Sequence, residues 1–159
     1  MSSERKTEFV QSIGIGLLVS AVLALGHVMY GINFMEMTAQ DIALLDSYVF
    51  FLSYGALALI SGMFYFLKED LSSSIAVFLS GFWALTFGLE DIIVYLYLGY
   101  FRETYPWLID TPAGIVANII GTEVTTFALF LNAAVFGYLT ALLVYGLYNY
   151  EEEIYGMEI

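Results

Sequence analysis

Long apolar stretches separated by short charged segments dominate this chain. Between Glu8 and Glu36 no acidic or basic residue occurs except one histidine. A helix needs about 20 consecutive apolar residues to cross the hydrocarbon core of a bilayer. This stretch exceeds that length, so we expect a transmembrane helix over about residues 9–30.

A second and a third transmembrane helix are predicted on either side of a short charged turn. The second covers about residues 47–67, although Thr38 and Asp41 have the spacing of a capping box that would start it earlier. The third covers about residues 71–98. Because only the three charged residues 68–70 separate the two helices, we expect them to be antiparallel neighbours.

The last third of the chain predicts an irregular segment, a short helix and a final span. Thr111 is a good capping residue, and the proline that follows it suits the first helical position. We expect a short helix at the membrane interface over Pro112–Ile120 and a fourth transmembrane helix over about residues 122–148. The predicted fold class is therefore an all-α integral membrane protein, with a four-transmembrane-helix bundle forming a single domain over residues 1–159.

Composition agrees with this class and excludes several functions. The chain is 60% hydrophobic and has no cysteine, so disulfides and thiolate metal sites are ruled out. His27 is the only histidine, which excludes a zinc site with several histidines within one chain. The net charge of −12 argues against nucleic acid as a partner, because nucleic-acid binding requires a basic surface.

The few basic residues predict the orientation in the membrane. Arg5, Lys6 and Lys68 fall on one side of the predicted spans and only Arg102 falls on the other. Basic residues are enriched in cytoplasmic loops. We therefore expect a multi-pass protein of the cell membrane with both termini in the cytoplasm.

Small residues recur four positions apart along three of the predicted helices. In lipid, such stripes allow helix backbones to approach closely, and close packing drives helix association there. They predict contacts within the bundle and leave surface for a homo-oligomer or for other membrane subunits, besides the lipid bilayer itself. The packing candidates are Gly16, Ser20, Ala84, Gly88, Ala133 and Gly137.

Ionisable residues inside predicted spans form the one candidate site for chemistry. Such residues are costly in a membrane and usually have a function. Counted at 1.5 Å per residue, they lie about 27–33 Å from the predicted cytoplasmic boundary, in the outer half of the bundle. The binding or metal candidates are His27, Glu90, Asp91, Glu123 and Asp46.

Four interpretations of these residues remain open. They could mark the outer interface and reach water by snorkelling, although the mostly apolar residues 92–101 that follow Glu90 and Asp91 argue against a helix end there. His27 and Asp91 could form a structural pair, because each lies on the small-residue face of its helix. The carboxylates could also hold a divalent metal ion, with His27 as the one nitrogen ligand, or they could line a proton or ion pathway.

Three functions from different classes follow from these interpretations. The first is binding of a cation or small ligand for transport or sensing, which interruptions at Gly88 or Gly121 would favour. The second is a metal-dependent intramembrane hydrolase acting on a lipid, with Glu90 as the general base. The third is a structural subunit of a larger membrane complex, which requires only the packing stripes. No complete catalytic or cofactor motif occurs in the chain.

Overall fold

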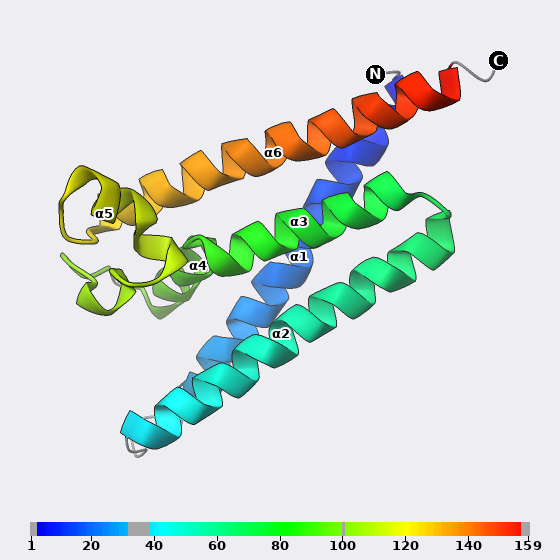
Figure 1. Cartoon of the computed structure of the whole chain (residues 1–159). Helices are drawn as coiled ribbons and strands as arrows, with labels where there is room; N and C mark the ends of the chain where they lie inside the picture. Colours follow the sequence, from blue (N-terminus) through cyan, green and yellow to red (C-terminus); the bar gives the residue numbers. More distant parts are fainter. Residues whose placement is uncertain (1–2, 32–38, 100, 157–159) are drawn as a thin grey trace.

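The computed structural model describes residues 3–31, 39–99 and 101–156, and this part of the chain is helical without any strand (Figure 1). Besides the helices it contains one isolated antiparallel bridge, between Thr104 and Thr125. The elements in chain order are α1 (Ser3–Gly31), α2 (Ala39–Lys68), α3 (Leu71–Thr86), α4 (Leu89–Leu98), the 3₁₀ turns η2 (Pro106–Leu108) and η3 (Pro112–Gly114), α5 (Ile115–Ile120) and α6 (Thr126–Gly156).

Three of these helices are long and apolar enough to cross a membrane. They are Ser3–Gly26 of α1, Phe51–Lys68 of α2 and Thr126–Glu151 of α6. A fourth span exists if α3 and the segment Leu89–Tyr97 of α4 are taken together. The prediction of an all-helical membrane protein is confirmed to this extent for the described residues.

The prediction of a single helix over residues 71–98 is wrong in one respect. This segment forms two helices, α3 and α4, with a break between them. The two axes are bent by 61° at Phe87 and Gly88. Gly88 has a φ of 98°, a left-handed conformation that L side chains rarely adopt and glycine tolerates. The apolar stretch is continuous through the break, so hydropathy by itself does not reveal it.

The turn between α2 and α3 follows the prediction. α2 ends at Lys68, and Asp70 caps α3 by accepting a 3.1 Å hydrogen bond from the backbone N–H of Ser72. α2 begins at Ala39, well before residue 47; the capping residue proposed for this earlier start, Thr38, lies outside the described residues.

The segment between α4 and α6 contains the expected short helix. The turn η3 and the helix α5 together cover Pro112–Ile120. Thr111 occupies the capping position, but its hydroxyl donates backwards to the carbonyl of Leu108 at 2.8 Å and makes no capping hydrogen bond. The last helix begins at Thr126, slightly later than predicted.

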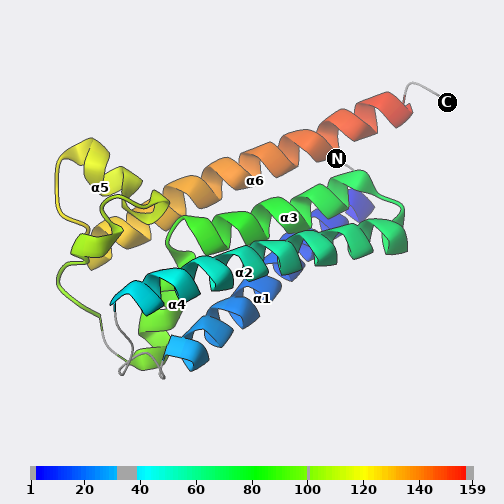
Figure 2. The same cartoon turned by 60° about the horizontal axis from the view of Figure 1, so that its bottom comes forward.

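α3 is the central helix of the protein. It lies between α2 and α6, and α1 crosses all three at an angle (Figures 1 and 2). The side chains that α3 buries are small for most of its length, which allows three neighbours to approach one helix. The buried residues of α3 are Ser72, Ser73, Ser74, Ala76, Val77, Ser80, Gly81, Ala84 and Leu85.

α1 and α3 approach each other closely at Gly16. A methyl group added to Gly16 would overlap Ser80 Oγ and the backbone carbonyl oxygen of Val77. Ser20 Oγ lies 3.0 Å from the carbonyl oxygens of both Gly16 and Gly81, so its hydroxyl joins the two helix backbones. This surface therefore leaves no room for a larger side chain at Gly16.

Polar and aromatic contacts hold α2 and α6 against α3. Ser61 Oγ of α2 donates to the carbonyl of Ser74 at 2.6 Å, and Ser74 Oγ donates back to the carbonyl of Ser61 at 2.7 Å. On the other side, Trp83 Nε1 donates to the carbonyl of Ala133 at 3.0 Å. A methyl group on Gly137 would lie 2.6 Å from Cζ2 of the Trp83 indole, so α6 presents a flat small-residue surface to this ring.

Candidate functional site

The break between α3 and α4 places two acidic residues at the start of a new helix. Glu90 and Asp91 lie in the first turn of α4, directly after Gly88, and both side chains are half-buried. The N-terminal end of a helix carries a partial positive charge that stabilises nearby carboxylates. The break therefore lowers the cost of two acids in an otherwise apolar segment.

Hydroxyl groups from α2 and α3 lie beside these acids. Tyr54 of α2 and Thr86, the last residue of α3, share a 2.6 Å hydrogen bond between their hydroxyl groups. Glu90 is close enough to the Tyr54 hydroxyl to interact with it electrostatically, and Asp91 interacts in the same way with Tyr95 one turn along α4. Carboxylate and hydroxyl oxygens thus gather at the break from three helices.

A single asparagine on α6 holds the break in place. Asn132 is fully buried, and its Nδ2 donates to the carbonyl oxygens of Phe87 at 2.9 Å and Pro112 at 3.1 Å. Its Oδ1 accepts a 3.0 Å hydrogen bond from the backbone N–H of Val116. These bonds give the carbonyl at the end of α3 a partner and tie it to the start of η3 and to α5.

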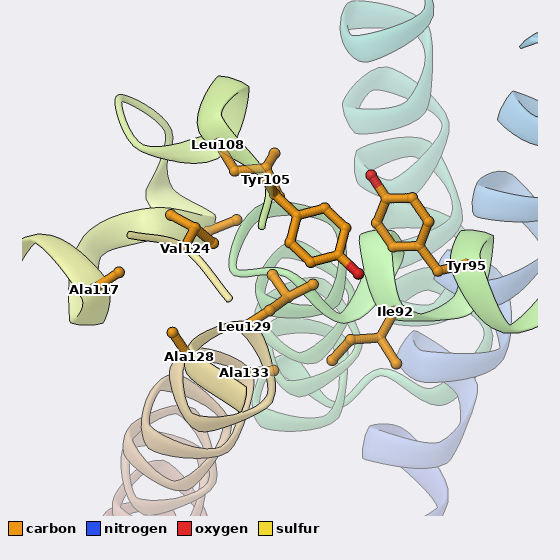
Figure 3. Packing of buried hydrophobic residues seen from close by; sticks show 10 residues of the cluster. Ile92, Tyr95, Tyr105, Leu108, Ala117, Val124, Ala128, Leu129 and Ala133 are labelled. Carbon is orange, nitrogen blue, oxygen red and sulfur yellow. The ribbon is translucent and has the colours of Figure 1, made fainter. Parts of the chain in front are cut away.

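An apolar cluster joins α4 to residues 105–124 and to α6 (Figure 3). The ring of Tyr105 lies in the middle of this cluster and packs on Tyr95 of α4 with ring centroids 4.8 Å apart. The Tyr105 hydroxyl accepts a 3.0 Å hydrogen bond from the backbone N–H of Arg102 and lies 3.2 Å from Thr126 Oγ1. The irregular segment before α5 is therefore anchored to both α4 and α6.

The remaining predicted site residues are not brought into this group within the described part of the chain. Glu123 is exposed in the connection before α6. His27 belongs to α1 and Asp46 to α2, but both side chains lie outside the described residues, so their approach to Glu90 and Asp91 stays a prediction. Among the described side chains, no three acidic or histidine residues converge in a way that could hold a metal ion.

A second polar cluster lies at the opposite end of the helices, where α1 begins and α6 ends. Arg5 of α1 pairs with Glu8 and with Asp70 of the α2–α3 turn, both at 3.1 Å, and also with Glu151 of α6. Its guanidinium lies 5.2 Å from the ring centroid of Tyr148. Arg5 thus connects three helix ends. It is one positive charge surrounded by three carboxylates.

A chain of hydroxyl groups connects this ion cluster to the interior. Ser73 Oγ donates to Asp70 and lies 2.7 Å from the hydroxyl of Tyr148, which in turn lies 3.1 Å from Ser12 Oγ. Ser12, Ser73 and Tyr148 are all buried. These side chains come from α1, α3 and α6, so they fix the relative positions of the three helices at this end.

Sequence reasoning missed this second cluster. It used Arg5 only as evidence for orientation, and it gave no role to Glu8 or Glu151. Two signals were present: three consecutive serines at the start of α3, and Ser12, which begins the small-residue stripe of α1. Neither signal identifies its partner, because Tyr148 is 136 residues from Ser12 in sequence.

Comparison of the chain with protein-family models, with curated proteins and with solved structures finds no match.

Proposed function

We propose that this chain is a four-span protein of the cell membrane, with its third span broken, that binds a cation for transport or sensing at the break. The observation that carries the proposal is the position of Glu90 and Asp91 in the first turn of α4, immediately after the glycine that breaks the span. Broken helices at membrane depth commonly form ion and substrate sites in transporters.

The chemistry of the surrounding groups supports a cation as the ligand. Two carboxylates begin α4 directly after the break, and Thr86, which ends α3 before it, shares a hydrogen bond with the hydroxyl of Tyr54. Oxygen donors of this kind suit hard or borderline cations. α1 packs against α4, so we include His27 of α1 as a further ligand. The hydrolase alternative needs a metal with three protein ligands in addition to a general base. With Glu90 as the base, the site leaves only Asp91 and His27 as ligands, so this alternative has less support.

Loss of either carboxylate should weaken cation binding. We expect Glu90→Gln and Asp91→Asn each to lower the affinity for the bound cation at least about tenfold, which corresponds to about 1.4 kcal/mol. Elemental analysis of the purified protein identifies any retained metal, and calorimetric titration with Zn²⁺, Mn²⁺, Ca²⁺ and Na⁺ measures the affinities.

Glu123→Gln is the matched control, because it removes one acidic charge from an exposed position near the same end of the molecule. Its affinity should equal that of the parent protein. Equal affinities in the parent, Glu90→Gln and Asp91→Asn proteins would refute the site.

The orientation is a separate prediction. The chain has no cysteine, so single cysteines introduced at the exposed positions Ser3 and Glu103 report the sides of the membrane without interference. In sealed cells, a membrane-impermeant maleimide should label Glu103→Cys from outside and should label Ser3→Cys only after lysis. Labelling of Ser3→Cys in intact cells would reverse the assignment.

A further inference from the structure

A small cavity lies beside the ion cluster, at the end of the helices away from the break. It has a volume of about 40 Å³ and opens between α1, the end of α2 and the α2–α3 turn. A buried water needs about 10–15 Å³ of such space, so the cavity can take a group of the size of an ammonium ion with accompanying water. Its lining residues are Glu8, Gln11, Ser12, Phe64, Lys68, Asp70 and Ser73.

The charges around the cavity are of both signs and are not balanced. The ion cluster and the lining together contain three carboxylates, from Glu8, Asp70 and Glu151, against the two cations Arg5 and Lys68. Arg5 forms ion pairs with all three carboxylates, whereas Lys68 forms no ion pair within the described part of the chain. A ligand that complements this arrangement carries a positive group for the acids and a negative group for Lys68.

The cavity lies among the ends of candidate membrane spans. Three candidate spans begin or end at this level, at Ser3, Lys68 and Glu151. Phe64 forms an apolar wall, and the neighbouring side chains of Phe66 and Leu67 are 80% and 78% exposed, as expected for residues that contact acyl chains. The end of α2 beside the cavity thus carries exposed apolar side chains, which favours contact with lipid there.

We propose that this cavity binds the headgroup of a phospholipid with a primary ammonium group. The ammonium donates hydrogen bonds to Glu8 and Asp70, and the phosphate pairs with Lys68. A primary ammonium has three N–H donors that can reach carboxylate and hydroxyl oxygens in so small a space, whereas a quaternary choline group has none and is larger. The site therefore distinguishes ethanolamine from choline headgroups. The inference shares the membrane-spanning arrangement of the proposed function but involves none of the residues at the break.

Native mass spectrometry of the full-length protein in detergent tests the site. Titration with dioleoyl phosphatidylethanolamine, phosphatidylcholine and phosphatidylglycerol should show the tightest binding for the first lipid. We expect Glu8→Gln to lower the affinity for phosphatidylethanolamine about tenfold, to the level of phosphatidylcholine. Lys68→Gln should lower the affinity for both lipids about tenfold, because both carry the phosphate. Lys6→Gln is the control, because Lys6 is exposed on the same helix but does not line the cavity.

Soluble glycerophosphoethanolamine provides a further arm of the test. Competition by this molecule against the lipid supports recognition of the headgroup chemistry alone, and failure to compete supports a lipid whose acyl chains add to binding. Equal affinities for phosphatidylethanolamine and phosphatidylcholine would overturn the proposal, as would an unchanged preference in Glu8→Gln or an unchanged affinity in Lys68→Gln. Lys68 is exposed at the end of α2, so its substitution leaves the packing of the helices intact.

Discussion

Gly16→Ala should lower the stability of the protein, whereas Gly14→Ala should raise it. Replacement of glycine by alanine within a helix normally stabilises it by about 0.5–1 kcal/mol. At Gly14 nothing lies within 4 Å of the added methyl group, so this gain should be realised. At Gly16 the methyl group overlaps the backbone carbonyl of Val77, and relief requires α1 and α3 to separate.

Overpacking of this kind typically costs about 1–3 kcal/mol, and Gly16→Leu should cost more and reduce the folded yield in detergent. Unfolding in SDS, followed by circular dichroism, gives the sign and the size of each change. The two alanine variants have the same composition, and the substituted positions are two residues apart on one helix. The difference in stability between them therefore excludes any general effect of replacing glycine by alanine. A stability gain in both variants would show that α1 does not pack on α3 through Gly16.

Asn132→Leu should be among the most destabilising single changes in the chain. The substitution removes the partners of two carbonyl oxygens, of Phe87 and Pro112, and of the N–H of Val116. A buried polar group left without a partner costs about 1–3 kcal/mol, so we expect a total loss of at least about 3 kcal/mol. The loss of stability should be localised at the break, because Phe87 lies between α3 and Gly88.

Asn149→Leu provides the comparison on the same helix. Asn149 is half-buried near the other end of α6, and its replacement should change the stability by less than about 1 kcal/mol. The same SDS unfolding measurement applies, and the fluorescence of Trp83, which packs beside the break, should change in Asn132→Leu and stay constant in Asn149→Leu. Similar stability losses in the two variants would mean that Asn132 does not organise the break.

Both predictions depend on contacts that a sequence pattern does not contain. The stripe through Gly16 and Ser20 predicted a packing surface on the first helix, but the atoms that crowd Gly16 belong to Val77 and Ser80, more than 60 residues away. For Gly88 the stripe predicted a packing position. The structure places Gly88 in close contact with α6, since a methyl group there would lie 2.7 Å from Leu129, and adds a left-handed conformation that the stripe does not predict.

The candidate site was predictable only in part, for a similar reason. The sequence by itself identifies Glu90 and Asp91 as candidates, because charged residues inside an apolar stretch are costly in a membrane. Their placement in the first turn of a separate helix requires the break, and the hydroxyl groups beside them come from α2 and α3. The ion cluster around Arg5 was not predictable, because its carboxylates lie on three separate segments of the chain.

By itself, the sequence determined the helical class, the candidate spans and the turn at residues 68–70. Hydropathy and capping act over a few neighbouring residues, so they can be read along the chain. Only the tertiary structure decided that the apolar segment 71–98 breaks into two helices. The freed carbonyl of Phe87 needs a buried donor, and Asn132 supplies it from 45 residues further along the chain. It also decided that α1 crosses α3 at Gly16, because close packing in a membrane depends on which two surfaces are small at the same depth.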